Sequence, residues 1–369
     1  MTDPITNIPS FWNIRCYLIK FFIHAGLTVR AKWPLKCKEF LFFTSLHQKL
    51  YLKNHFHFVK LIMKLRLLLI FTCLLVGLSH ASAQVLQNWM NPDITQAWSQ
   101  GYKGAGTTIT FVDDFSTASS AKFSGNMNGA TQNQAHGYWT SEQSSLVAPS
   151  ATIQTVDYNT TSNQAVPLTK LGLNVVNLSY ALYVPTASFN TNIYLGAEQT
   201  SLINDAKNGT AVISKAAGND GIPMTFTSGR TVGVYGAANG LDVMNYFLRG
   251  TQSGIYVGAL SSNGSTSKPA SMAYYSNTPG TDSVVQSHFL VVGVNSSQMG
   301  GLAGTSFAAP IISGYAAILG SKFSAATPTA ITNDLLNTAR TDTLKNYSAS
   351  IYGKGEASLS RALAPASIH

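Results

Sequence analysis

The sequence predicts an α/β fold, in which helices flank a doubly wound and mainly parallel sheet. Two short apolar runs, Leu173–Ser179 and Thr210–Lys215, are rich in β-branched residues and predict strands. Between them, Asn192–Asn208 carries apolar residues at helical spacing, and the following Gly209 is typical of a helix end. A strand, a helix and a strand in this order predict a parallel crossover unit, which is the building block of such a sheet.

The remaining elements extend this pattern on both sides. Three further runs are apolar and rich in β-branched or aromatic residues, and they predict strands at Thr107–Val112, Ile255–Leu260 and Phe289–Val294. A short helix is expected at Asp93–Gln100, because Gly101 can close it. The sheet should therefore begin near residue 107 and continue past residue 290.

Two helices are expected near the end of the chain. Ser306–Phe323 is apolar or small on every side, which predicts a buried helix. Thr327 is a good N-cap and Pro328 suits a first helical position, so a second helix should run from there to about Ala339.

The positive charge and the cysteines are confined to the first 83 residues. That segment holds 11 Lys/Arg and 2 Asp/Glu, while the remainder holds 13 of each. The neutral remainder excludes the nucleic-acid or membrane-surface partner that a net charge of +9 would otherwise suggest. Because Cys16, Cys37 and Cys73 also lie in the first segment, the remainder has no disulfide, no thiolate nucleophile and no cysteine-based zinc site.

A pattern typical of an export signal begins at Met63. Two basic residues are followed by the apolar run Leu67–Leu78 and by Ala81-Ser82-Ala83, a small-residue cleavage site. The run is shorter than the ~20 residues of a membrane helix, so no stable span is expected once the signal is removed. We expect a signal peptide at 63–83 and an exported product, periplasmic or secreted, whose folded domain occupies 84–369.

Residues 1–62 precede this signal and show no clear hydrophobic period. We interpret them as upstream sequence translated from a misplaced start, with Met63 as the true first residue. A long N-terminal extension with a role of its own is the alternative.

Ser306 is the candidate nucleophile, because Gly304-Thr305-Ser306 opens the buried helix. A serine hydroxyl needs a base, exposure at a tight turn and a positive field for the developing oxyanion. A Gly-x-Ser sequence at a helix N-terminus supplies the turn and the field together. The alternative is that Ser306 only caps a core helix. Polar residues also follow three predicted strands, at Asp113, Ser179 and Asn219, where the chemistry of such sheets gathers.

Several segments resemble the subtilisin-like, or subtilase, family of serine peptidases. The strongest match is Gly304–Pro310 (GTSFAAP), which fits the nucleophile motif of the family at seven consecutive positions. Gly104–Asp113 resembles its first strand and aspartate, Ala216–Asp220 its oxyanion loop, Val175–Ala181 its substrate-pairing strand and Tyr352–Leu363 its closing helix. Within the family, the sequence resembles bacterial exported and autotransporter-type members most. The candidate residues occur along the chain in the order Asp, His, Ser, which is the order in subtilisin.

This resemblance implies a role for each candidate residue. Asp113 would orient His136, the base that activates Ser306. The side-chain amide of Asn219 would help to stabilise the oxyanion. An extended peptide substrate would lie against two backbone segments, namely Ser179, Tyr180 and Ala181 on one side and Ala217 and Gly218, in the wall of the primary specificity pocket, on the other.

The segment around the base departs most from the family. His-Gly-Thr-His-Val is usual, whereas Ala135–Thr140 reads AHGYWT. Beyond residue 83 the only other histidines are the terminal His369 and His288, which precedes a predicted strand, so His136 is the expected base. Asp114 follows Asp113 directly, but successive side chains on a strand point to opposite faces, and adjacency to the apolar strand favours Asp113.

These residues predict a serine endopeptidase that hydrolyses protein or peptide substrates through an acyl-enzyme. A catalytically impaired subtilisin fold that binds peptides is the alternative, because the segment after His136 is altered. An esterase is disfavoured, since Ala308 stands where a Gly-x-Ser-x-Gly elbow requires glycine. We expect no cofactor and no metal ligand among the candidate site residues. A structural calcium ion stays open as an alternative, which no dense Asp/Glu loop supports.

Overall fold

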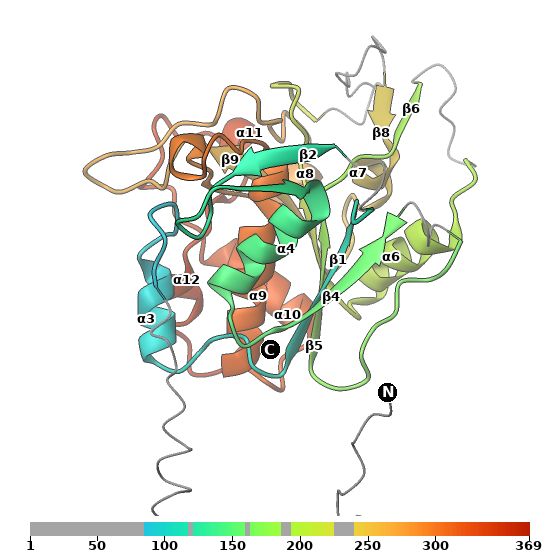
Figure 1. The fold of residues 1–369 in the computed structure, drawn as a ribbon, viewed down its shortest axis with the longest axis horizontal. Coiled ribbons are helices and arrows are strands. Elements are labelled where there is room, and N and C mark those ends of the chain that lie inside the picture. Colours follow the sequence, from blue (N-terminus) through green and yellow to red (C-terminus); the bar gives the residue numbers. More distant parts are fainter. Residues whose placement is uncertain (1–84, 117–120, 159–162, 186–192, 225–239) are drawn as a thin grey trace, which may run out of the picture. The chain divides into compact units, whose positions relative to one another are not determined.

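A seven-stranded parallel sheet forms the centre of the part of the chain that the structure describes (Figure 1). This computed structural model describes residues 85–116, 121–158, 163–185, 193–224 and 240–369. In the order of the sheet, the strands are β11 (Gly355–Glu356), β10 (Phe289–Gly293), β9 (Gly254–Leu260), β7 (Val212–Ala216), β5 (Leu173–Leu178), β1 (Thr107–Asp113) and β4 (Thr152–Asp157). Every neighbouring pair runs parallel, which confirms the predicted sheet.

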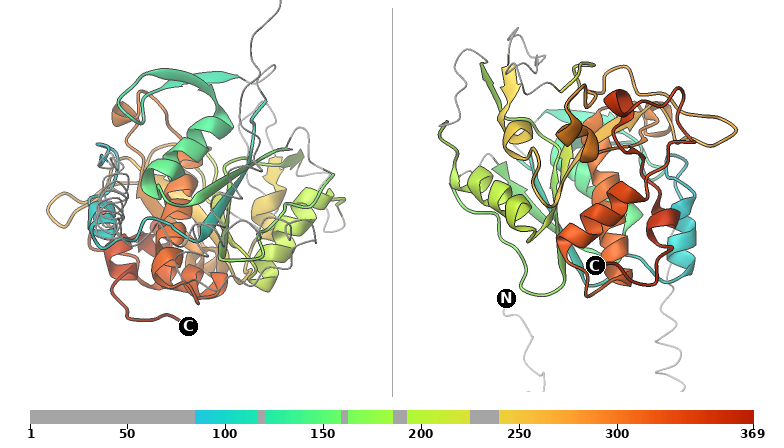
Figure 2. Two further views of the ribbon diagram at one scale, coloured as in Figure 1. Left: turned by 60° about the horizontal axis from the view of Figure 1, so that its bottom comes forward. Right: turned by 180° about the vertical axis from the view of Figure 1, so that it is seen from behind.

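Helices cover both faces of this sheet (Figure 2). One layer contains α3 (Asp93–Ser99), α4 (His136–Val147), α9 (Ala309–Lys322), α10 (Pro328–Asn337) and α12 (Leu359–Ala362). The other contains α6 (Ala197–Asn208), α7 (Val243–Phe247), α8 (Ser283–Ser287) and α11 (Ala349–Tyr352). Along β1, Ile109 and Phe111 join the core under the first layer and Val112 joins the second, as the alternation of strand side chains requires. The doubly wound arrangement is therefore confirmed.

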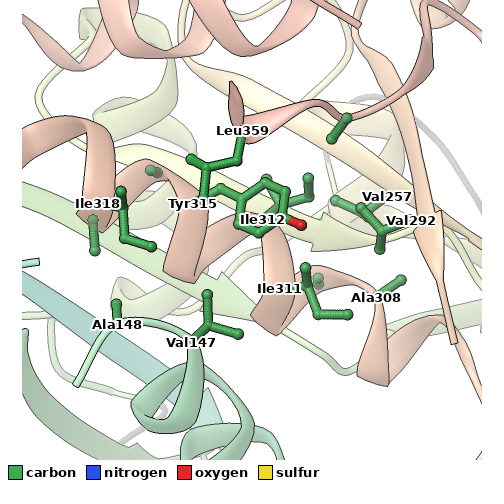
Figure 3. Packing of buried hydrophobic residues seen from close by; sticks show 14 of the residues in the cluster. Val147, Ala148, Val257, Val292, Ala308, Ile311, Ile312, Tyr315, Ile318 and Leu359 are labelled. Carbon is green, nitrogen blue, oxygen red and sulfur yellow. The ribbon is translucent and has the colours of Figure 1, made fainter. Parts of the chain in front are cut away.

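The helix that carries most of the first core is α9, which is buried along almost its whole length. It packs against β1, β5 and β7 and against α4. Ile311, Ile312 and Tyr315 fill the space between these elements (Figure 3). At Gly314 an added Cβ would lie 2.6 Å from Val147 Cγ1, so the missing side chain is what allows α4 to approach.

Within the described ranges, two antiparallel ribbons lie outside the main sheet. The first pairs β2 (Lys122–Gly125) with β3 (Gln132–Ala135), and β3 leads directly into α4. The second pairs β6 (Tyr183–Pro185) with β8 (Gly240–Asp242), and β8 leads directly into α7. Each ribbon therefore determines where one helix begins.

Most predicted elements are present, with small shifts at their ends. Helix α10 begins as predicted, because Thr327 Oγ1 accepts the Ala330 N–H at 3.1 Å and Pro328 occupies the first turn. Gly209 closes α6 in the left-handed conformation, with φ of 63°. This helix begins at Ala197, later than the predicted Asn192, which lies outside the described residues.

Two predicted helices are wrong in their extent. The one expected from Ser306 is a 3₁₀ turn, η4 (Thr305–Phe307), and α9 starts only at Ala309. The closing helix expected over Tyr352–Leu363 is interrupted by β11, which pairs with β10. Gly353 and Gly355 have φ of 59° and 124°, which no helix accommodates, and so the chain there turns into the sheet.

The predictions for 1–62 and 63–83 concern residues outside the described part of the chain. The expected signal peptide and the expected start at Met63 therefore stay predictions. Within the described ranges, no helix has both the length and the apolar character needed to cross a bilayer.

Candidate active site

The carboxyl ends of three neighbouring strands bring the candidate residues to one edge of the sheet. β5 lies between β1 and β7. Asp113 ends β1, Ser179 directly follows β5, and Asn219 lies three residues beyond the end of β7. Ser306, in the η4 turn before α9, reaches the same edge through its hydrogen bonds to Ser179. Residues far apart in the sequence thus meet where a parallel sheet places its chemistry.

Asp113 and His136 form a short contact that is largely buried. His136 Nδ1 lies 2.6 Å from Asp113 Oδ1, and Asp113 is only 1% exposed. The same oxygen accepts the Asp114 N–H at 2.7 Å, and Thr140 Oγ1 lies 3.1 Å from Oδ2. These donors satisfy a carboxylate that has lost its water. Because a carboxylate only accepts hydrogen bonds, His136 Nδ1 carries the hydrogen that points to Asp113. The other ring nitrogen, Nε2, is left for a reacting group.

The surroundings of His136 act on its pKa in opposite directions. Burial lowers the pKa, because the charged imidazolium loses hydration. The Asp113 carboxylate raises it, both by its charge and by its hydrogen bond, and the charge of Asp114 adds in the same sense. The pKa of His136 lies above its usual 6.5 as a result, so the ring takes up a proton more readily than a free histidine.

The residues that follow His136 hold its ring in place by local contacts. Gly137 donates its N–H to Asp114 O at 3.0 Å, and an added Cβ would lie 2.7 Å from that oxygen. The fully buried Trp139 donates its Nε1–H to Phe123 O at 2.8 Å, which ties α4 to the β2–β3 ribbon. The glycine is therefore required for close approach, and the unusual tryptophan anchors the helix that begins at His136.

Ser306 and Ser179 hold each other through two reciprocal hydrogen bonds. Ser306 Oγ donates to Ser179 O, and Ser179 Oγ donates to Ser306 O, each at 3.0 Å. Among the described residues, no hydrogen bond joins Ser306 to His136, although the ring of Phe307 lies 6.0 Å from the imidazole, centre to centre. The Ser306 side chain therefore has to rotate before its hydroxyl can meet Nε2.

Asn219 presents a side-chain amide close to this turn. Thr305 donates its N–H at 2.7 Å and its hydroxyl at 2.9 Å to Asn219 Oδ1. Because both groups donate, the atom of the Asn219 amide that they contact is its oxygen, Oδ1. The amide nitrogen, Nδ2, then points away from Thr305 as a donor. In the part of the chain that the structure describes, neither this Nδ2 nor the Ser306 N–H has a hydrogen-bond partner. Two unengaged donors beside a serine form an arrangement that can stabilise an oxyanion.

The buried Asn277 supports the loop that carries Asn219, and no sequence pattern points to it. Its Oδ1 accepts the Asp220 N–H at 3.0 Å, and its Nδ2 donates to Ala217 O at 3.1 Å. Its own N–H donates to Gly218 O at 2.9 Å. A Cβ at Gly218 would lie 2.2 Å from Asn277 Nδ2, so this glycine is required. No local pattern identifies a partner that is 60 residues away.

A family model agrees with this geometry. The model described as the subtilase family matches residues 104–355. The chain belongs to the subtilase family. The resemblance drawn from the nucleophile loop and the strand ends is thereby confirmed, and it places the chain among the serine peptidases.

Weaker likenesses exist among solved structures, and the family assignment does not depend on them. The MycP3 protease from the type VII (ESX-3) secretion system shares 20% identity over 73% of this chain and 86% of its own, with a TM-score of 0.47. MycP1 from Mycobacterium smegmatis shares 19% over 78% and 86%, with a TM-score of 0.47. A cold adapted subtilisin-like serine proteinase shares 17% over 70% and 88%, with a TM-score of 0.41. No curated protein matches the chain.

In this subtilase the expected substrate-binding residues form two adjacent segments. Ser179, Tyr180 and Ala181 follow β5, whereas Ala217 and Gly218 follow β7. Since β5 and β7 are neighbours, the two segments leave the sheet side by side. The Tyr180 hydroxyl donates a hydrogen bond to Oε1 of the buried Glu198 at 3.1 Å.

The structure also shows where the alternative candidates for the orienting aspartate and the base lie in this subtilase. Asp113, and not Asp114, lies against His136; Asp114 Oδ1 instead accepts the Ser116 N–H at 3.1 Å. His288 pairs locally at the end of α8, with Nδ1 3.1 Å from Val284 O. Over the described ranges, no group of three His, Cys, Asp or Glu residues is arranged to hold a metal ion.

Proposed function

We propose that this subtilase is an exported serine endopeptidase with Ser306 as nucleophile, His136 as base and Asp113 as the residue that orients the base. The observation that carries the proposal is the 2.6 Å contact between Asp113 and His136 at the sheet edge that the η4 turn with Ser306 also reaches. A general base needs a fixed orientation and an accessible second nitrogen. The His136 side chain is anchored at Nδ1 and is 25% exposed, which supports this role.

The chemistry follows from these positions. Ser306 Oγ attacks the carbonyl carbon of the scissile peptide while His136 Nε2 takes the hydroxyl proton. Negative charge then develops on the carbonyl oxygen, where the Ser306 N–H and Asn219 Nδ2 stabilise it. The imidazolium gives its proton to the leaving amine, and an acyl-enzyme on Ser306 results. Water, activated by the same histidine, releases the acid and restores the serine.

Substrate itself can free the nucleophile from Ser179. An extended peptide that pairs with the segment after β5 presents a backbone N–H to Ser179 O. That carbonyl is where the Ser306 hydroxyl rests, so the two donors compete for one acceptor. Once the peptide N–H takes the acceptor, the hydroxyl is free to rotate towards His136.

The same resting contact motivates the second candidate function. A peptide-binding protein without activity would keep Ser306 on the Ser179 carbonyl permanently. Casein hydrolysis by purified protein, with Ser306→Ala as the control, separates the two functions. We expect cleavage that the variant lacks, whereas peptide binding without cleavage would support the alternative. The rates of hydrolysis of casein and of a short ester substrate, compared for the same protein, test the esterase hypothesis.

The substrates and the location follow from the same proposal. A neutral domain behind an export signal suits proteins or peptides met outside the cytoplasm, in the periplasm or the medium. Expression from Met63 should give an extracytoplasmic protein that begins at Gln84, as N-terminal sequencing would show. A mature N-terminus upstream of Met63 would contradict the misplaced start.

A further inference from the structure

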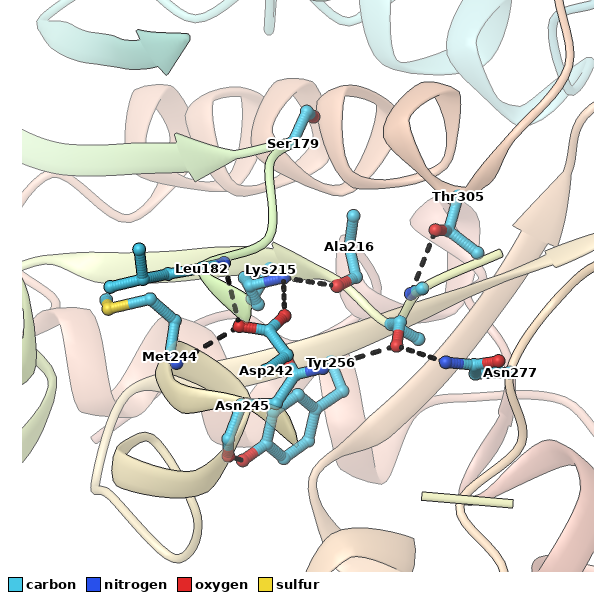
Figure 4. Close-up of polar contacts among 12 residues, drawn as sticks. Ser179, Leu182, Lys215, Ala216, Asp242, Met244, Asn245, Tyr256, Asn277 and Thr305 are labelled. Atoms are coloured by element: carbon cyan, nitrogen blue, oxygen red, sulfur yellow. Dashed lines mark hydrogen bonds and ion pairs between the residues drawn. The ribbon is translucent and has the colours of Figure 1, made fainter. Parts of the chain in front are cut away.

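A buried ion pair connects the two segments that follow β5 and β7. Lys215 Nζ lies 2.9 Å from Asp242 Oδ2, and the two side chains are only 1% and 4% exposed. Lys215 belongs to β7 in the middle of the sheet, and Asp242 ends β8 in the second ribbon. Figure 4 shows both side chains together with the backbone groups that they bind.

On one side, Asp242 holds the segment after β5. Its Oδ1 accepts the Leu182 N–H at 3.2 Å, and Leu182 directly follows Ala181. The backbone strengthens this connection, because Tyr183 pairs with Asp242 in the β6–β8 ribbon. The carboxylate therefore fixes the end of the first substrate-binding segment.

On the other side, Lys215 holds the start of the segment after β7. Its Nζ donates to Ala216 O at 2.7 Å. Helix α7 supports the same segment, since Asn245 Nδ2 donates to Ala217 O at 3.3 Å. Asp242 caps that helix by accepting the Met244 N–H at 3.1 Å (Figure 4). The ion pair and the helix that it caps therefore bind both segments at once.

We propose that Lys215 and Asp242 are positioning residues that set the width of the primary specificity pocket, and so determine the size of the residue accepted before the scissile bond. The inference rests on the proposed function and on the pocket walls that the subtilase resemblance implies for these two segments. A wider substrate side chain has to part the walls, and the ion pair resists this movement. The two side chains bind backbone groups of Leu182, Ala216 and Met244, which belong to the walls and to α7, so we expect the chemical step to be left alone.

Fold stability alone does not account for this pair. Each charge loses its hydration on burial, and apolar side chains of similar size often give equal or greater stability at such positions. Charge-assisted hydrogen bonds differ from apolar packing in that they fix direction and distance. An ion pair between two pocket walls therefore fixes the distance between them, which apolar packing would not do.

The test compares wild-type protein with the double variant Lys215→Met/Asp242→Asn, which removes the pair without leaving a lone buried charge. Peptide p-nitroanilides that differ only in the residue before the scissile bond, from glycine to phenylalanine, give kcat/KM for each size. The rate of fluorophosphonate labelling reports the catalytic machinery separately. Arg249→Met is the matched control, because it breaks an ion pair with Asp282 (2.7 Å) that holds neither wall.

In the double variant we expect the ratio of kcat/KM between the best and the worst residue to fall at least about 10-fold. The change should appear mainly in KM, and the labelling rate should stay within about 3-fold of wild type, because the chemical step is untouched. The control should match wild type in both assays. Asp242→Glu keeps the charge but moves the carboxylate, so it should shift the preferred size.

A double variant that is folded by circular dichroism and keeps the wild-type ratio would overturn the inference. So would an equal loss of selectivity in the Arg249→Met control. Should the double variant not fold, an unchanged preference in Asp242→Glu would overturn it equally. A wild-type protein that neither reacts with the fluorophosphonate nor cleaves any substrate would contradict the proposed function itself, and the inference would fall with it.

Discussion

The two halves of the active site differ in their readiness for catalysis. On the base side, His136 and Thr140 already contact the Asp113 carboxylate. On the nucleophile side, the Ser306 hydroxyl is turned to the Ser179 carbonyl. The base side is nevertheless the part that departs most from the family motif, whereas Gly304–Pro310 fits that motif at every position.

This contrast teaches that a sequence motif reports backbone geometry more than it reports side-chain state. Gly304 has φ of 134°, and its residue type is dictated by the turn that it makes. The Ser306 hydroxyl changes partner by rotation about one bond between staggered positions. A buried carboxylate has no such freedom, because it needs its donors at all times. Breaking contacts on the base side should therefore have the larger effects.

The largest effect is expected from Asp113→Asn. An amide at this position favours the wrong imidazole tautomer, so kcat at neutral pH should fall by about 10⁴-fold. Asp114→Asn is the matched control, and its loss should stay below about 10-fold because Asp113, whose Oδ1 lies 2.6 Å from the His136 ring, still orients the base. Steady-state kinetics on both variants, with folding checked by circular dichroism, measure the difference. Reversed losses would mean that the other aspartate orients the base.

A smaller effect is expected from Asn219→Ala on the nucleophile side. Loss of one oxyanion donor should lower kcat by about 10²–10³-fold and leave KM nearly unchanged, because the interaction forms only in the transition state. Kinetics with one peptide substrate test this. A variant that keeps full kcat would show that Asn219 only shapes its turn.

Thr140→Val sharpens the comparison within the base side. The substitution removes the hydroxyl that lies 3.1 Å from Asp113 Oδ2 and preserves the shape of the side chain. We expect kcat to fall about 10-fold, since the buried carboxylate loses a donor and orients His136 less firmly. Thr140→Ser, which keeps the hydroxyl, should retain most of the activity. Equal losses in the two variants would assign the effect to packing.

The pH dependence reports the same contact from the side of the histidine. His136 acts as a base only when neutral, and its pKa is raised above 6.5. Activity should therefore rise with pH through an apparent pKa above 6.5. In Asp113→Asn the charge and the hydrogen bond of that carboxylate are lost, and only the smaller effect of Asp114 still opposes burial, so the pKa of His136 should fall below that of wild type. NMR titration of the imidazole in both proteins checks the sign, and an unchanged pKa would contradict the contact.

The smallest effect concerns the helix behind the base. Gln143 is fully buried on α4, and among the residues that the structure describes neither its side-chain nitrogen nor its oxygen has a hydrogen-bond partner. Gln143→Met should raise the free energy of unfolding by about 1–3 kcal/mol, because two unsatisfied polar atoms are removed. The neighbouring Ser144 donates to Pro310 O at 2.5 Å, so Ser144→Ala should instead destabilise. Thermal unfolding of both variants measures these changes in stability. A destabilised Gln143→Met would indicate that the amide has a hydrogen-bond partner in the folded protein.

The elements that were predicted well are those whose residue types directly reflect how deeply they are buried. The central strands read as apolar runs because both of their faces are buried, and every residue of β5 and β9 is buried. The missed elements lack such a signal. Helix α4 buries polar residues, including Thr140, Gln143 and Ser144, so no apolar period marks it. At the edge of the sheet, β4 is only partly buried and mixes polar with apolar residues.

The site was predictable where one local segment carries the geometry, and unpredictable where distant segments share it. The turn around Ser306 and the loop around Asn219 each stand on a short run of residues. Asn277 supports the second loop from another part of the chain, and Lys215 lies in a strand that reads as apolar. The roles of such residues depend on partners such as Asp242, which only the fold brings near.

Covalent labelling is the most direct test of the proposed mechanism. A fluorophosphonate reacts with a serine whose proton is taken by a nearby base. Residues 84–369 should acquire one adduct, located at Ser306 by tandem mass spectrometry. The adduct should be absent in Ser306→Ala and strongly reduced in His136→Ala. An unlabelled but folded wild-type protein, or an adduct on a different serine, would contradict the assignment of Ser306 as a nucleophile served by His136.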